Sequence, residues 1–271
     1  MTIVDFSGAL AKLERAEIHL GVLQEEIRAY IESEPVTFDA KPNADGSSED
    51  FYFRFVEPIP PSFGLILGDC THNLRSVLDH IAMSLAIENG TDPYDRTVYF
   101  PICLNPEEFF GANLVGSYAV APLRGTGRYR VRRLSVVAQT FIEAMQPYHR
   151  MSEAWPLIEL EYLDNWDKHR AILTHAFHQL VQMEVTHPGV TVEYAATGRL
   201  EDGAHFATIH YAPDYSGVKV KPPLYAGISV ERSNRIGFLV IPDFVMNNLI
   251  DQIRGIWSEA ERRFGVWQGV I

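Results

Sequence analysis

The chain has 271 residues, of which 46% are apolar and 21% are charged, and its 23 basic and 35 acidic side chains give a formal charge of −12. This composition is typical of a globular protein and excludes a disordered, fibrous or coiled-coil chain. The acidic total also argues against a protein that coats nucleic acid through its overall charge, although a local basic site remains compatible with it.

The two cysteines and the hydropathy pattern indicate where the protein is found. Cys70 and Cys103 lack the spacing of a metal site and are too few for a disulfide framework, so we expect free thiols in a reducing compartment. The first residues lack a basic stretch followed by an apolar core. The longest apolar runs are shorter than the ~18 residues of a membrane span. We therefore expect a cytoplasmic protein with no membrane partner.

The N-terminal part of the sequence predicts two helices and a hairpin. Apolar residues at three- and four-residue steps predict an amphipathic helix over 8–32, with Ser7 as its N-cap. Aromatic and β-branched runs then flank a polar Asp-Gly stretch, which predicts a hairpin at 36–57. A second helix is expected over 62–89, ended by Asn89-Gly90.

The rest of the chain predicts further helices and a sheet. We expect a strand at 98–102, a short helix from Pro106, and helices over about 131–146 and 155–183. Alternating residues in 184–241 predict three to five antiparallel strands, and a last helix is expected over 243–264. The fold class is therefore α+β. Residues 1–183 form a helical bundle with the inserted hairpin, and 184–271 form strands and a helix that pack with the bundle as one unit.

The helix over 62–89 contains many residue types that can carry out chemistry. Its apolar face is made of Leu74, Val77, Leu78, Ile81 and Leu85. A polar stripe on another side is made of Asp69, His72, Asn73, Ser76 and His80. So many hydrogen-bonding groups on one line of a bundle helix must be solvated or satisfy one another.

Four residues separate Arg75 from His80, so the pair matches the Arg-x4–6-His motif, and this helix resembles the HEPN superfamily. The resemblance covers about residues 8–180. It implies a metal-independent ribonuclease that acts as a homodimer. It also implies that His80 handles protons and that Arg75 stabilises the charge that develops when the ribose 2′-hydroxyl attacks the phosphate.

A structural alternative exists for the same helix. Five residues along a helix rotate by about 500°, so Arg75 and His80 point about 140° apart. Arg75 and Asp79 are instead an i,i+4 pair that can form a salt bridge. In that case the polar stripe is a solvated helix face with an ion pair.

Residues 164–170 place four successive polar side chains in a helix that is otherwise apolar on nearly every side. Such residues are costly unless they pair or face a cleft. We expect Asp167, His169 and Arg170 to form a second cluster that faces the helix over 62–89. The alternative is a buried ion-pair network, for example Asp167 with Arg75. His175 and His178 could bind a metal together, but no third ligand is evident, so we expect no metal or cofactor.

Residues 109–142 contain no carboxylate and form a basic island with five arginines, Arg124, Arg128, Arg130, Arg132 and Arg133. Arg132 and Arg133 fall at the start of the predicted helix over 131–146, where cations oppose the helix dipole and a bound phosphate relieves the penalty. Tyr129 can stack on a base. The alternative is an exposed loop whose arginines pair with surface carboxylates.

The sequence thus leaves three hypotheses. The first is a HEPN-like ribonuclease whose basic island steers RNA. The second is a non-catalytic helical module that binds RNA, a phosphorylated ligand or a protein partner. The third is a purely structural bundle whose polar helix faces form satisfied ion pairs. It would be favoured by an Arg75 bridged to Asp79 or Asp167 that is buried and has no cleft beside it.

Overall fold

The computed structural model describes residues 3–149, 155–169, 174–178, 188–194, 202–215, 226–230, 239–240 and 243–265. Contacts divide the chain into two compact units. Unit 1 comprises Met1–Val22, Leu65–Ala171 and Asp243–Ile271, and unit 2 comprises Leu23–Gly64 and Ile172–Pro242. This division does not coincide with the expected one after residue 183. The last helix clusters with the first two, whereas the hairpin clusters with the later strands.

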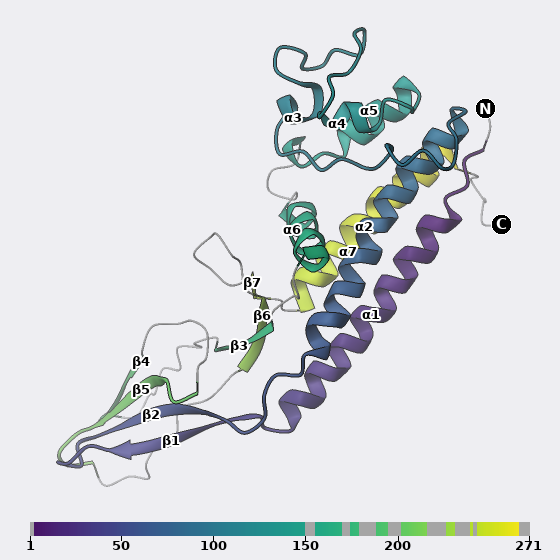
Figure 1. The fold of residues 1–271 in the computed structure, drawn as a ribbon. Helices are drawn as coiled ribbons and strands as arrows, with labels where there is room; N and C mark the ends of the chain where they lie inside the picture. Colours follow the sequence, from purple (N-terminus) through teal and green to yellow (C-terminus); the bar gives the residue numbers. More distant parts are fainter. Residues whose placement is uncertain are drawn as a thin grey trace. The chain divides into compact units, whose positions relative to one another are not determined.

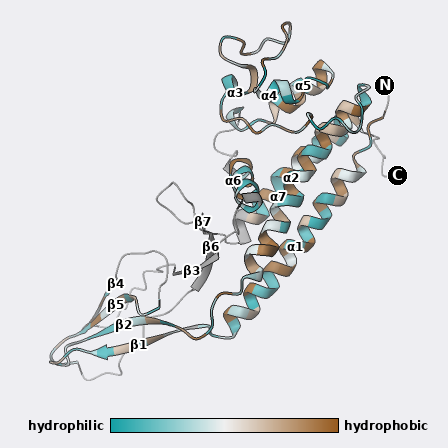
Figure 2. Cartoon of the chain, viewed as in Figure 1, coloured by the Kyte–Doolittle hydropathy of each residue, from teal (hydrophilic) through white to brown (hydrophobic). Residues whose placement is uncertain are grey.

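Unit 1 contains four longer helices (Figure 1). They are α1 (Ser7–Glu32), α2 (Ser62–Glu88), α6 (Trp155–His169) and α7 (Asp243–Phe264), and the ends of α1 and α2 reach into unit 2. The Cys70 thiol donates to the Ala16 carbonyl at 3.3 Å, and Arg254 of α7 pairs with Glu17 of α1. Figure 2 shows apolar and polar residues interspersed along these helices, as expected for amphipathic elements. The predicted helices over 8–32, 62–89 and 243–264 are confirmed.

The ends of two helices follow known capping rules. Helix α1 begins at Ser7, and the Phe6 carbonyl accepts the first helical bond from the Leu10 N–H, so Phe6 stands at the N-cap position expected for Ser7. The Asp5 carboxylate accepts a hydrogen bond from the Ser7 N–H at 2.8 Å and so satisfies a free N–H group of the first turn. At the end of α2, Gly90 has a φ of +84°. Its N–H bonds to the Ile87 carbonyl, and the Thr91 N–H bonds to the Ala86 carbonyl. This pair of bonds is a Schellman motif, which confirms the predicted stop.

The segment between α2 and α6 differs from expectation in two places. It contains α3 (Pro106–Phe110), α4 (Gly127–Arg130), α5 (Val136–Ala144) and the 3₁₀ helix η1 (Pro147–His149). The short helix from Pro106 is confirmed. Residues 98–102 do not form a strand, because side chains of α2 bond the Phe100 backbone. The helix expected over 131–146 begins only at Val136, after the Ser135 cap.

The prediction of a helix over 155–183 is also wrong beyond its first half. Helix α6 ends at His169, and Thr174–His178 form strand β3. This strand pairs with β6 (Ala226–Val230), and such long-range pairing overrides the local helical pattern. The helical i,i+3 spacing that suggested a metal pair at His175 and His178 therefore does not exist.

Unit 2 contains two antiparallel sheets, which confirm the hairpin and the expected strands. One sheet has the order β1 (Val36–Pro42), β2 (Ser48–Phe55), β5 (His205–Tyr211), β4 (Val190–Tyr194). The other has the order β3, β6, β7 (Leu239–Val240). Buried aromatic rings hold the first sheet together, and Phe53 stacks on Phe206 at 4.2 Å between ring centroids. Among the residues described, no helix is both long and apolar enough to cross a membrane.

Candidate acid–base and phosphate-binding site

The predicted apolar face of α2 forms the centre of unit 1. Leu74, Val77, Leu78, Ile81 and Leu85 are all buried, as expected. Burial of these apolar side chains is favourable, so α2 is stabilised in the one rotation about its axis that turns this face toward the core. The remaining positions of α2 are thereby assigned to defined sides of the helix.

The polar residues of α2 are divided between two sides. His72, Arg75 and Asp79 stand at i, i+3 and i+7, so they share one face. That face contacts α6 and the segment around Phe100. Asn73 and His80 lie on the side that faces α1. The structure therefore does not bring Arg75 and His80 together within one chain.

Arg75 and Asp79 form a clamp on the backbone of Phe100. The guanidinium of Arg75 donates to the Phe100 carbonyl at 2.5 Å, and the Asp79 carboxylate accepts from the Phe100 N–H at 2.9 Å. The two side chains also pair with each other at 3.2 Å, and that of Arg75 is only 13% exposed. The salt bridge expected in the structural alternative is thus confirmed.

His80 lies against α1. A β-carbon on Gly8 would approach the Nδ1 of His80 to 2.8 Å, so glycine permits this close contact. Lys12 is nearby and donates to the Asn73 side-chain oxygen at 3.3 Å. Partial burial lowers the pKa of His80, the charge of Lys12 lowers it further, and Asp79 opposes both effects.

Acidification is expected to destabilise the wild type more than His80→Gln. In the unfolded chain His80 has a pKa near 6.5, above its folded value. The unfolded state therefore binds a proton first, and stability falls as the pH drops through that value. Urea unfolding between about pH 7.5 and about pH 5 measures this difference. His19→Gln on α1 is the control, and an identical pH dependence of His80→Gln and wild type would contradict the prediction.

Helices α2 and α6 meet, as expected for the second cluster. His72 Nδ1 lies 3.5 Å from the Asp164 carboxylate; the histidine side chain is 57% exposed and that of Asp164 only 3%. One turn earlier on α2, Gly68 contacts the Asp167 carboxylate so closely that a β-carbon would collide with it. Arg170 and the His169 side chain lie outside the described residues, so their part of the prediction stays open.

Two further groups surround this meeting point. Burial raises the pKa of the Glu161 carboxyl on α6, Arg75 opposes this shift, and the carboxylates of Glu108 and Asp164 add to it. Ser76 Oγ donates to the His72 carbonyl at 2.9 Å, and Asp69 is exposed one turn before Asn73. The α2–α6 contact thus combines an exposed imidazole with several carboxylates.

The arginines of the basic island do not share one role. Arg128 is 4% exposed and its guanidinium donates to the carbonyls of Ser117 and Tyr118 and to Gln139. It is therefore a structural cation inside unit 1. Arg124 is exposed. The dipole argument for Arg132 and Arg133 is wrong, because α5 begins after them at Val136.

Two chain segments, 94–99 and 129–133, lie side by side through three contacts. Arg130 stacks on Tyr99 at 4.6 Å, Arg132 donates to Thr97 at 2.9 Å, and Arg133 lies 3.4 Å from Asp95. Arg132 also stacks on Tyr129 at 4.0 Å. These two segments carry what we call the Arg–Tyr surface, made of Tyr94, Arg96, Tyr99, Tyr129, Arg130, Arg132 and Arg133.

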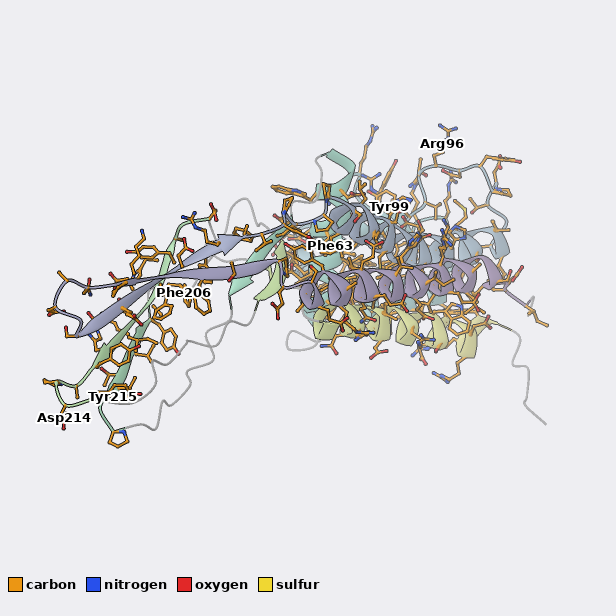
Figure 3. The ribbon with its side chains drawn as sticks, turned by 90° about the horizontal axis from the view of Figure 1, so that it is seen from below. Phe63, Arg96, Tyr99, Phe206, Asp214 and Tyr215 are labelled. Carbon is orange, nitrogen blue, oxygen red and sulfur yellow. The ribbon has the colours of Figure 1, made fainter. Side chains whose placement is uncertain are left out.

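The Arg–Tyr surface adjoins the polar face of α2. Arg130 stacks on the ring of Tyr99, and the next residue is Phe100. Arg75 and Asp79 form hydrogen bonds with the backbone of Phe100. Arg96 is exposed and points away from the helices in Figure 3, where Tyr99 lies closer to them. Tyr94 is 88% exposed. The sequence did not show this adjacency, because segments 94–99 and 129–133 are about thirty residues apart.

A separate pocket in unit 2 had no counterpart in the sequence-based predictions. It has a volume of about 410 Å³ and is lined by Asp45, Gly46, Ser47, Tyr211, Ala212, Pro213 and Tyr215. The rings of Tyr211 and Tyr215 stack at 5.3 Å, and Figure 3 shows Tyr215 beside Asp214. The Asp-Gly turn of the hairpin is the only sequence signal for this region.

Comparison with known proteins gives no match: no family model, no curated protein and no solved structure is similar to this chain. The resemblance to the HEPN superfamily therefore stays a prediction, as does the homodimer that it implies. Among the described residues, no group of three or more His, Cys, Asp or Glu side chains is placed to hold a metal ion.

Proposed function

We propose that this protein binds single-stranded RNA through the Arg–Tyr surface. The observation that carries the proposal is the contact between segments 94–99 and 129–133, which together contain four arginines and three tyrosines. Asp92 and Asp95 are the carboxylates of the adjoining loop, so the surface keeps a positive balance on an acidic protein.

The two residue types suit the two parts of a nucleotide. Guanidinium groups donate to phosphate oxygens in a fork, and stacking on a tyrosine ring, as Arg130 stacks on Tyr99, does not use the donating edge of the guanidinium. Arg132 already donates to Thr97 and to the Tyr129 carbonyl. Exposed aromatic rings stack on unpaired bases, each worth about 1–3 kcal/mol. Tyr94 and Arg96 are both exposed and supply one group of each type. A duplex hides its base faces, so a single strand fits better.

The acidic remainder of the chain shapes the selectivity of this binding. The formal charge of −12 disfavours non-specific binding of nucleic acid to the chain as a whole. We therefore expect few phosphate contacts and a shallow dependence of affinity on salt, in contrast to a protein that coats RNA.

Double replacement Tyr94→Ala with Arg96→Ala is expected to weaken binding of a labelled single-stranded RNA about tenfold or more, because one stack and one phosphate contact are lost. Fluorescence anisotropy at two salt concentrations measures the affinity. Arg15→Ala removes another exposed charge, from α1, and should leave binding unchanged.

Three results would overturn the proposal. They are absence of RNA binding by the wild type at low salt, unchanged affinity of the double variant, and equal affinity for inorganic polyphosphate. The last result would mean that binding depends on the charge of the ligand alone and not on stacking of its bases. Binding of a phosphorylated ligand or a protein partner is the alternative in that case.

The predicted ribonuclease activity of Arg75 and His80 is a separate matter. Arg75 is occupied by Phe100 and Asp79, and His80 points toward α1. Within one chain the two side chains therefore have different neighbours, and RNA binding does not depend on them.

A further inference from the structure

We propose that the pocket of unit 2 binds a small molecule that carries an alkylated ammonium group, such as choline. The residues that line this pocket belong to unit 2, whereas the Arg–Tyr surface belongs to unit 1. The proposal therefore does not depend on RNA binding. It rests on the shape of the pocket, its aromatic wall and the sign of its charge.

Hydrogen bonds between two segments hold the pocket in a fixed shape. One segment is the turn between β1 and β2, residues 45–47, and the other follows β5, within residues 211–215. The Tyr211 N–H donates to the Ser47 carbonyl at 2.7 Å and joins the two segments. Within the turn, the Asp45 carboxylate accepts from the Ser47 N–H at 3.0 Å. The volume of about 410 Å³ falls within the usual range of small-ligand sites.

Two tyrosines form the aromatic wall of the pocket. Tyr211 and Tyr215 line it, and both pack against the buried aromatic cluster of the sheet, which holds them in place. The Tyr211 hydroxyl donates to the Glu49 carboxylate at 3.1 Å, and Glu49 is only 7% exposed. A phenol that donates to a carboxylate is polarised so that its ring gains electron density. Such a ring attracts a cation to its face.

The charge of the pocket is negative. Of the described residues that line it, Asp45 carries a charge in neutral solution and none is basic. Hydrogen bonds from the backbone and the side chain of Ser47 lower the pKa of Asp45, so its carboxylate stays ionised there. Asp214, which precedes Tyr215 in the chain, adds an exposed carboxylate (Figure 3). The pocket therefore disfavours an anion and favours a cation.

The aromatic wall selects among cations. A metal ion or a primary ammonium group is strongly hydrated, and tyrosine rings offer few oxygens to replace the lost water. Alkyl groups on the nitrogen weaken its hydration and can contact the rings directly. Aromatic sites in proteins recognise quaternary ammonium ligands in this way. An alkylated ammonium group thus suits both the tyrosines and the Asp45 carboxylate.

Calorimetric titration of the full-length protein with choline tests the proposal. The comparison ligand is the uncharged carbon analogue of choline, in which a tert-butyl group replaces the trimethylammonium group and the shape is kept. We expect choline to bind with a Kd of about 1 mM or lower. The analogue should bind at least about tenfold more weakly, because it has no charge for the rings and the carboxylate to attract.

Two variants of the pocket should weaken choline binding. For Tyr215→Leu we expect a loss of about fivefold or more, because leucine fills apolar volume but has no aromatic face. For Asp45→Asn we expect a loss of about threefold or more, because the charge is removed. Asparagine keeps an oxygen for the Ser47 N–H and is favoured before glycine in hairpin turns, so the turn is preserved.

Matched controls make the same chemical changes elsewhere. Tyr52→Leu alters a ring of the same sheet that contacts Lys41 and His205 and does not line the pocket. Asp92→Asn alters an exposed carboxylate that accepts from the N–H two residues later, as Asp45 does. Both controls should bind choline like the wild type.

Several results would overturn the proposal. They are absence of choline binding by the wild type, equal binding of the carbon analogue, and wild-type affinity in both pocket variants. An equal loss in Tyr52→Leu would also overturn it, since the effect would then be one of sheet stability. If Tyr215→Leu fails to fold, Asp45→Asn and the carbon analogue still decide the question. None of these results bears on RNA binding, which is measured with another ligand and other residues.

Discussion

Arg128→Met is expected to lower the free energy of unfolding by about 3–5 kcal/mol, because three acceptors lose hydrogen bonds to a charged group, a type of bond worth about 1.5–3 kcal/mol each and not fully additive. Methionine fills a similar volume but has no donors. The Ser117 and Tyr118 carbonyls, at 2.6 and 3.0 Å from the guanidinium, would lose their bonds, and so would the Gln139 side chain at 3.3 Å. Stacking of the guanidinium on the Tyr118 ring would be lost as well.

Urea unfolding of the purified variant measures this loss. Arg124→Met is the matched control from the same basic island, and because Arg124 is exposed we expect a change within about 0.5 kcal/mol. If both variants were equally stable, Arg128 would not be the internal cation that its contacts indicate. A reduction of RNA affinity in Arg128→Met at temperatures where the variant stays folded would also argue against a purely structural role.

Arg75→Met is expected to lower the free energy of unfolding by about 2–3 kcal/mol. The guanidinium makes a charged hydrogen bond to the Phe100 carbonyl, a type of bond worth about 1.5–3 kcal/mol, and it also pairs with Asp79. Phe100 is fully buried, so its carbonyl has little access to water as a replacement partner. The loss is expected to be smaller than for Arg128, because Arg75 retains some exposure.

A double-mutant cycle with Asp79→Asn tests whether Arg75 and Asp79 act as one unit. Asparagine still offers an oxygen to the Phe100 N–H, so Asp79→Asn alone should cost less than Arg75→Met. We expect the double variant to lose less stability than the sum of the single losses, since the residues are in contact. Strictly additive losses would contradict the clamp, and wild-type stability of Arg75→Met would leave Arg75 available for catalysis.

The sequence was sufficient where local pattern and tertiary packing agree. The helices over 8–32, 62–89 and 243–264 have apolar residues at helical spacing along their length, and each formed as predicted. The hairpin followed from aromatic runs on both sides of a turn around Gly46, whose φ of +72° suits glycine. These elements needed no knowledge of distant contacts.

The sequence failed where distant groups decide the local structure. Residues 98–102 look like a strand, but the Phe100 backbone bonds side chains of Arg75 and Asp79, more than twenty residues away. Residues 174–178 continue the helical pattern of α6, yet they pair with β6, about fifty residues later. Neither partner can be read from local propensity.

The same limit applies to the candidate site. The sequence by itself determined that α2 has an apolar face and a polar stripe, because helical periodicity follows directly from residue order. It also showed that the five arginines of 109–142 have no carboxylates among them. Only the tertiary structure decided that Arg128 is internal, that Arg75 holds Phe100, and that His72 meets Asp164. Such roles depend on which segments pack together, and burial and pairing are properties of that packing rather than of any one segment.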